Sequence, residues 1–251
     1  MITTHVVPDA RTAGSLVAER IARLVRAVPA AVIGVATGSS PLPVYRALAD
    51  LVDGGLDLSR VTWFALDEYV GLPPEHPESY RSVLDRELVA PLGLDRLRVH
   101  VPEPGSDPYA AAAAYEADIV RAGGIDLQLL GIGGNGHLGF NEPGTPFGIP
   151  THVAELTHAT RRDNARFFPS LLEVPTLCVT QGLGTIGRAR AHALIATGEA
   201  KAAAVAAALT GPVGPECPGS LLQRCPDVFV ALDDAAAGGV EPTGQEIDAV
   251  R

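Results

Sequence analysis

Short apolar runs that alternate with helical segments constrain the fold of this chain more than any other feature. The runs at 31–36 (AVIGVA) and 227–232 (DVFVAL) are apolar almost throughout, as are strands covered on both faces of a parallel sheet. Helical patterns lie between the runs, and the first of them places Val17, Ile21 and Leu24 on one face. The alternation predicts an α/β fold with a doubly wound, mostly parallel sheet and helices on both faces. The predicted strands are 6–7, 31–36, 61–66, 97–101, 127–132, 154–157, 176–180, 191–197 and 227–232.

The 251 residues are expected to form one Rossmann-like domain over 1–251, because no linker or repeat interrupts the alternation. Helices are predicted to begin at Asp9, Ser79 and Asp107, whose side chains can cap a first turn. Residues 238–251 are expected to form a loosely ordered tail.

Composition excludes several classes of partner. The chain has 19 basic and 29 acidic residues, and its net charge of −10 argues against nucleic acid or an anionic membrane as a partner. No apolar run is long enough to span a bilayer, and the first residues lack the pattern of a signal peptide. Three cysteines without a CxxC pair favour reduced thiols in the cytoplasm over a disulfide framework or a zinc site.

The stretch 125–150 (IDLQLLGIGGNGHLGFNEPGTPFGIP) joins a strand to a glycine-rich loop that carries polar side chains. Asn135, His137, Asn141 and Glu142 can donate, accept and titrate where the glycines let the backbone approach a ligand. Residues 131–136 match GxGxxG, but the following LGFNEP is a poor helix start, which argues against a dinucleotide site. The glycines of this loop are Gly131, Gly133, Gly134, Gly136 and Gly139.

A hydroxyl-rich turn, Thr37-Gly38-Ser39-Ser40, joins the strand 31–36 to a helix that begins near Leu42. Free backbone N–H groups and the helix dipole favour phosphate at such a turn, and the hydroxyls add donors. An ordinary N-cap is the alternative, although it requires only one hydroxyl. The turn lacks the GK[ST] of a P-loop, so a nucleoside triphosphate is not implied.

Asp67 and Glu68 directly follow the predicted strand 61–66. Ligands of open α/β sheets bind beyond the carboxyl ends of the strands, so both carboxylates are candidates for acid–base chemistry. Because neighbours on a strand point to opposite faces, we expect only one of them to face the site. A solvated turn or a helix cap is the alternative interpretation for either residue.

Arg166 and Lys201 are candidate partners of a bound anion. Lys201 is the only lysine of the chain and lies in the first turn of a helix that follows the strand 191–197. The helix dipole disfavours a cation there, and a bound anion would explain the placement. Arg166 belongs to a short helix predicted at 160–168, where it could clamp a phosphate, although surface arginines are usually solvated.

Six motifs together resemble the glucosamine-6-phosphate deaminase/isomerase family, in the order and spacing of that family over residues 37–201. They are TGSSP, LDEYVGL with EHPESY, GIGGNGHLGFNEPG, LTHATR with NARFF, VTQGLGTI, and TGEAK. The 6-phosphogluconolactonases resemble the chain in the strand–GxG–GH core but typically lack the FNEP and DEYVGL motifs.

The resemblance implies that D-glucosamine 6-phosphate and water are converted into D-fructose 6-phosphate and ammonia, with no metal or redox cofactor. It implies that Asp67 moves a proton between C2 and C1, that His137 opens the sugar ring, and that Glu142 orients the imidazole. Asn135 joins these catalytic residues. The implied substrate-binding residues are Thr37, Gly38, Ser39, Ser40, Glu68, Gly131, Gly139, Arg166 and Lys201.

Two departures from the family pattern bear on this reading. Asn135 stands where some members carry Asp, so an amide would contact the imidazole and leave it less basic. His152 and Ala154 stand where larger members bind N-acetylglucosamine 6-phosphate through a basic pair, which argues against that regulation. Monomer and homo-oligomer both remain open. The alternative functions are a 6-phosphogluconolactonase and a non-catalytic sugar-phosphate sensor.

Overall fold

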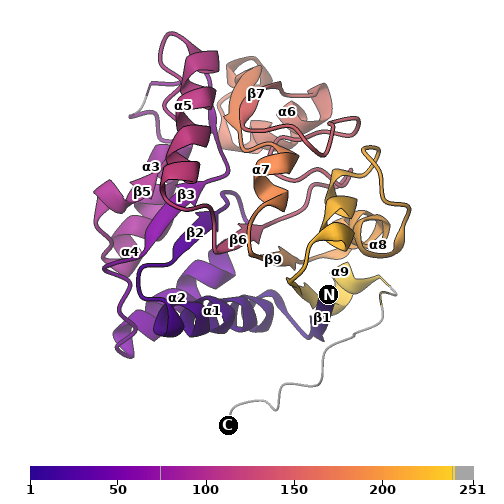
Figure 1. The fold of residues 1–251 in the computed structure, drawn as a ribbon. Coiled ribbons are helices and arrows are strands. Elements are labelled where there is room, and N and C mark those ends of the chain that lie inside the picture. The colour runs from indigo at the N-terminus through magenta and orange to yellow at the C-terminus, as the bar shows by residue number, and fades with distance from the viewer. Residues whose placement is uncertain (74, 239, 241–251) are drawn as a thin grey trace.

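The computed structural model describes residues 1–73, 75–238 and 240. Its centre is a seven-stranded sheet in the order β1-β10-β9-β6-β2-β3-β5, and every adjacent pair is parallel (Figure 1). The sheet confirms the predicted doubly wound α/β architecture. Its strands are β1 (Ile2–Val7), β2 (Val32–Val35), β3 (Thr62–Ala65), β5 (Val99–His100), β6 (Leu127–Leu130), β9 (Ala191–Ala196) and β10 (Val228–Asp233).

Helices cover both faces of this sheet, as predicted. Successive side chains of β2 show why: Ile33 packs into a core with α1 and α2, whereas Val32 packs against Tyr115 and Ile119 of α5. In Figure 1, α1 and α2 lie below the sheet, and α5 and α7 lie above it. The helices are α1 (Ala10–Ala27), α2 (Leu42–Asp53), α3 (Tyr80–Leu84), α4 (Ala90–Leu92), α5 (Pro108–Arg121), α6 (His158–Asn164), α7 (Leu183–Gly187), α8 (Ala202–Thr210) and α9 (Asp234–Ala237).

The predicted helix starts are confirmed, because Asp9, Ser79 and Asp107 each cap the helix that follows. The helix expected over 79–89 is instead divided into α3, a π-turn and α4. Most of the tail expected at 238–251 lies outside the described residues, and Gly238 ends α9 in the left-handed conformation. The remaining turns are the π-turn Asp85–Val89 and the 3-10 turns Arg96–Arg98, Ala165–Phe167, Leu171–Glu173, Glu199–Lys201 and Pro218–Arg224.

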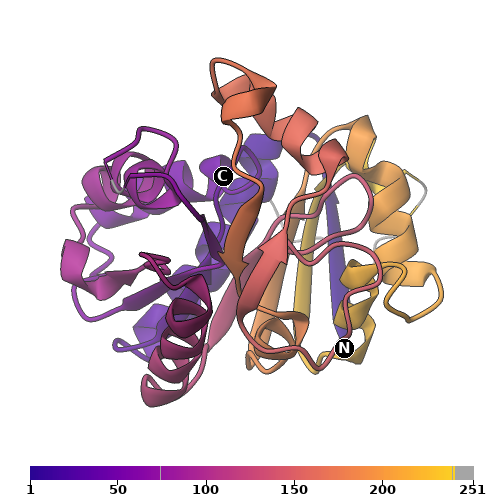
Figure 2. The ribbon, with the colours of Figure 1, turned by 90° about the horizontal axis from the view of Figure 1, so that it is seen from above.

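A second, antiparallel sheet corrects the expectation that the strands at 154–157 and 176–180 extend the parallel alternation. It has the order β4-β8-β7, with β4 (Asp67–Tyr69), β7 (His152–Glu155) and β8 (Leu177–Thr180). Figure 2 looks down on β7 and β8, which lie between α5 and α8 in that view. The chain changes sheets at Leu66, whose N–H donates to Val35 of β2 while its carbonyl accepts from the N–H of Gln181, just after β8. Asp67 therefore belongs to a paired strand rather than to a free strand end.

Within the described part of the chain, every helix is too short or too polar to cross a membrane.

Candidate active site

Three adjacent strands of the parallel sheet, β9, β6 and β2, send the loops that follow them to the same edge. The turn 37–40 follows β2, the glycine loop 131–142 follows β6, and Lys201 follows β9. Contacts join these segments: a Cβ added to Gly131 would lie 3.3 Å from the Ser40 Oγ, and one added to Gly134 would lie 4.0 Å from the Ala200 carbonyl. The predicted site segments therefore meet at the carboxyl edge of the sheet.

The glycine loop forms no helix before α6, so it does not have the geometry of a dinucleotide fingerprint. A tight turn shapes its first half, where the N–H of Gly133 donates to the His137 carbonyl over 3.0 Å. The imidazole of His137 lies directly against Gly133, because a Cβ there would be 2.2 Å from the ring. Only glycine leaves the room that this imidazole occupies.

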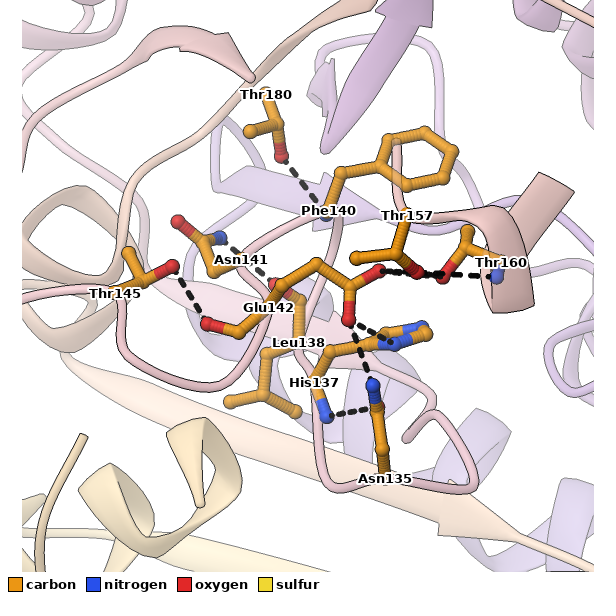
Figure 3. Close-up of polar contacts among 10 residues, drawn as sticks. All are labelled: Asn135, His137, Leu138, Phe140, Asn141, Glu142, Thr145, Thr157, Thr160 and Thr180. Carbon is orange, nitrogen blue, oxygen red and sulfur yellow. Dashed lines mark hydrogen bonds and ion pairs between the residues drawn. The ribbon is translucent and has the colours of Figure 1, made fainter. Parts of the chain in front are cut away.

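The side chains of His137 and Asn135 converge on one oxygen of Glu142 (Figure 3). The Nδ1 of His137 lies 3.7 Å from the Glu142 Oε2, and the Asn135 amide donates to the same oxygen over 2.7 Å. The Oδ1 of Asn135 accepts from the backbone N–H of His137 over 3.2 Å. The expected contact between the Asn135 amide and the imidazole is therefore replaced by contacts with Glu142 and the backbone. Asn135 folds back onto the chain two residues on, as Asn side chains do in turns.

The other oxygen of Glu142 is held from α6. Its Oε1 accepts from the hydroxyls of Thr157, over 3.1 Å, and Thr160. Burial opposes ionisation of Glu142, but its contacts with His137, Thr160 and Asn135 outweigh burial and lower its pKa to about 2. Glu142 is therefore an anion at neutral pH that stabilises positive charge on the neighbouring imidazole.

Asp67 has the opposite environment. Its side chain is buried, and no hydrogen bond reaches its carboxylate from the residues that the structure describes. Burial raises its pKa well above the usual value, and the charge of Glu68 adds to that effect. The carboxylate faces the glycine loop, because a Cβ added to Gly139 would lie 3.4 Å from the Asp67 Oδ2. A carboxylate with a raised pKa is a stronger proton acceptor than a solvated one.

Glu68 points away from this carboxylate, as strand alternation predicts, and is occupied elsewhere. It accepts hydrogen bonds of 2.8 to 2.9 Å from the backbone N–H groups of Tyr69, Tyr80 and Arg81. Two of these donors belong to the first turn of α3. The contacts of Glu68 are those of the helix-cap alternative, since it accepts from two N–H groups of α3, and its charge also raises the pKa of Asp67.

At the turn 37–40, no side chain caps α2, whose N-cap residue is Pro41. An ordinary N-cap therefore does not account for the three hydroxyls. Thr37 lies near enough to the hydroxyl of Tyr80 to influence its pKa, and that hydroxyl donates to the hydroxyl of Tyr69 over 3.2 Å. The Asn164 amide donates to the same Tyr69 hydroxyl over 2.9 Å, so a chain of polar groups connects the turn with α6. The tyrosines and Asn164 were not singled out from the sequence.

Lys201 and Arg166 lie near enough to influence each other. Burial lowers the pKa of Lys201, the positive charge of Arg166 lowers it further, and Asp163 opposes both. In the part of the chain that is described, neither cation forms an ion pair with a carboxylate, and Arg166 stacks only on Phe167. Two neighbouring cations without a carboxylate partner favour the binding of an anion between them. By contrast, Arg161 is occupied by the carbonyls of Leu171 and Val174.

Similarity to known proteins covers nearly the whole chain. The family model for glucosamine-6-phosphate isomerases/6-phosphogluconolactonase matches residues 9–230. Relatives named glucosamine-6-phosphate deaminase are 54% identical in Streptomyces avermitilis and 53% identical in Pseudarthrobacter chlorophenolicus, each over 92% of this chain and 90% of the relative. The solved structure of a monomeric glucosamine-6-phosphate deaminase superposes with a TM-score of 0.91 and 36% identity, over 94% of this chain and 98% of that one. The 6-phosphogluconolactonase of Trypanosoma brucei shares the fold, with a TM-score of 0.78, 20% identity, and coverage of 96% of this chain and 99% of the other.

Proposed function

Because this chain belongs to the glucosamine-6-phosphate isomerase/6-phosphogluconolactonase family, we propose that it is a glucosamine-6-phosphate deaminase. The reaction converts D-glucosamine 6-phosphate and water into D-fructose 6-phosphate and ammonia. The relatives at 53% and 54% identity carry the deaminase name. The observation that carries the proposal within the site is the buried carboxylate of Asp67, which has a raised pKa and faces the glycine loop.

The proposed reaction begins with opening of the sugar ring. His137 would pass a proton from the C1 hydroxyl to the ring oxygen, and ionised Glu142 would stabilise the imidazolium that forms in between. Asn135 supports this pair by donating to Glu142 and accepting from the His137 backbone. The product of this step is the open-chain amino-aldehyde.

Asp67 would then remove the proton from C2 and return it to C1, while the amino group gives up a proton and the C1 oxygen takes one up; this leaves a hydroxymethyl group at C1 and an imine at C2. Water adds to that C=N bond and ammonia leaves, so the release step is a hydrolysis. Lys201 and Arg166 would hold the phosphate with the turn Thr37-Gly38-Ser39-Ser40, in line with their unpaired charges. Gly131 and Gly139 would let the sugar approach Ser40 and Asp67.

A lactonase is the second candidate, because the fold is shared with 6-phosphogluconolactonases. Opening a lactone requires water to attack a carbonyl and requires no base for a carbon-bound proton. The environment of Asp67, which strengthens it as a proton acceptor, therefore favours the isomerase–deaminase reaction. The same environment argues against a non-catalytic sensor.

Ammonia release from glucosamine 6-phosphate, coupled to detection of fructose 6-phosphate without added metal, tests the proposal. Equal amounts of the two products support it. Hydrolysis of 6-phosphogluconolactone without ammonia release would assign the chain to the other activity of the family. Binding of the sugar phosphate without turnover in either assay would indicate a sensor.

The proposed setting is a single-domain enzyme of the cytoplasm. The three cysteines are free, which favours a reducing compartment. A solved structure that is similar to this chain is that of a monomeric enzyme, which supports a monomer as one of the two alternatives; a homo-oligomer is the other.

A further inference from the structure

We propose that Thr160, supported by Thr157, is a positioning residue for the ring-opening pair of His137 and Glu142. This inference rests on the proposed function. Thr160 fixes which oxygen of Glu142 faces the imidazole and keeps that carboxylate an anion. It acts through Glu142 and has no contact with the substrate in the reaction described above.

The contacts divide the two carboxylate oxygens of Glu142 between two sets of donors. Thr157 and Thr160 donate to Oε1, whereas Asn135 donates to Oε2, which also faces His137. A carboxylate bound at both oxygens cannot rotate without breaking one set of bonds. The threonine pair therefore keeps Oε2 directed at the imidazole (Figure 3).

Helix capping does not explain the hydroxyl of Thr160. Thr157 is the N-cap of α6 and accepts from the backbone N–H of Thr160 over 3.2 Å. Thr160 lies in the first turn of α6, where a threonine hydroxyl can bond the carbonyl of an earlier residue. Here it bonds Glu142 instead, and its side chain is only 5% exposed.

The segment that carries the threonines is itself anchored. Arg161, the next residue of α6, donates to the carbonyls of Leu171 and Val174 over 3.0 Å each. Asn164 at the end of α6 bonds the Tyr69 hydroxyl. These hydrogen bonds hold α6, and with it the hydroxyl of Thr160, in one position. A positioning residue must be held in this way, because a mobile hydroxyl would move with the carboxylate of Glu142 instead of fixing it.

The test compares Thr160→Val, which removes the hydroxyl at nearly constant shape, with Thr160→Ser, which keeps it. Thr160→Val should lower kcat by at least about 10-fold, because it removes a hydrogen bond to a charged group, while KM changes by less than about 3-fold. Thr160→Ser should restore most of kcat. Thr210→Val is the matched control, since its hydroxyl bonds only the Ala206 carbonyl in α8.

A deuterium label at C2 of the substrate identifies the affected step. If ring opening is slowed, the isotope effect on kcat in Thr160→Val is no larger than in the wild type. An isotope effect above the wild-type value would overturn the inference, because the substitution would then have slowed the proton transfer by Asp67 instead of ring opening. Wild-type kcat in Thr160→Val, or equal damage in Thr160→Ser, would also overturn it.

A second readout does not depend on activity. Titration of the Glu142 carboxyl carbon by 13C NMR should give a pKa near 2 in the wild type and in Thr160→Ser, and a higher pKa in Thr160→Val. An unchanged Glu142 pKa in a folded Thr160→Val protein would refute the inference. Absence of deaminase activity in the wild type would instead refute the proposed function, and the titration would still report on the threonine.

Discussion

Replacing Gly133 by alanine should move the His137 imidazole, which we propose opens the sugar ring, without unfolding the protein. A Cβ at Gly133 would lie 2.2 Å from the His137 Cε1 and 2.4 Å from both ring nitrogens. The backbone of Gly133 has a φ that alanine can adopt, because Gly133 is absent from the glycines with positive φ. The conflict is therefore confined to the methyl group and the imidazole.

The size of the displacement follows from ordinary contact distances. Two carbon atoms in contact are separated by about 3.5 to 4.0 Å, so the ring must retreat by about 1.3 Å or more. A shift of about 1 Å in a catalytic group can reduce the rate about 100-fold, which corresponds to about 2.7 kcal/mol in the activation barrier. The three atoms nearest to the added Cβ all belong to the ring of a side chain and none to the backbone, so the cost in stability should stay below about 1 kcal/mol.

Gly134→Ala is the matched control, since the nearest atom to its added Cβ is 4.0 Å away. Steady-state ammonia release and thermal unfolding would be measured for both variants and the wild type. We expect kcat to fall about 100-fold in Gly133→Ala alone, with similar melting temperatures in all three proteins. Normal turnover in Gly133→Ala, or equal losses in the two variants, would show that the contact between Gly133 and His137 does not set the position of the imidazole.

Three further predictions concern charged groups. Asp67→Asn should reduce turnover by about 100- to 10,000-fold and leave sugar-phosphate binding largely intact, and near-normal ammonia release would remove Asp67 as the base. Lys201→Ala should raise KM for the phosphorylated sugar by about 10-fold or more at unchanged melting temperature, because a charged partner of phosphate is lost, and an unchanged KM would contradict this role. The pKa of Glu142 is lowered to about 2 from 4.5, so its ionisation stabilises the fold fully above pH 4.5, and that contribution is lost as pH falls toward 2. Urea unfolding at pH 7 and pH 3.5 should therefore show a larger loss for the wild type than for Glu142→Gln, and equal losses would refute the lowered pKa.

The parallel sheet was predictable because its buried strands carry apolar runs that alternate with helical patterns, some of which begin at a capping residue. Asp9 and Asp107 illustrate this, since both caps are short-range hydrogen bonds that the local sequence specifies. The order of the strands was not predictable in the same way. Adjacency of β9, β6 and β2 depends on contacts between segments more than 60 residues apart, so the meeting of their loops emerges only in the folded chain.

The second sheet could not be predicted from the sequence, for a different reason. Strand β4 has only three residues and pairs with β8 more than 100 positions later. Three residues cannot display an apolar period, and an antiparallel pairing of distant segments leaves no turn motif between them. Asp67 was therefore found by its motif, while its pairing with Thr180 and its burial were not.

The hydrogen bonds of the site were harder to predict from the sequence than the pairing of β4 with β8. Thr157 was visible as part of a family motif, but nothing in the local sequence indicates that its hydroxyl reaches Glu142, fifteen residues earlier. Asn135 was singled out, yet its partner was predicted wrongly, because the tight turn at 133–137 directs its amide at Glu142 instead of the imidazole. Residue type indicates which groups can titrate, whereas their partners depend on how the loop folds.

The two carboxylates of the site acquire opposite properties from their hydrogen bonds. Both side chains are largely withdrawn from water, and withdrawal alone raises the pKa of any carboxyl group. Asp67 has no donor within the described chain, so burial prevails and its proton affinity increases. Glu142 has three side-chain donors and lies 3.7 Å from the His137 Nδ1, so its pKa falls despite burial. One group can thus take up and return a proton, while the other remains an anion beside the imidazole, and this division is what an isomerase with a ring-opening step requires.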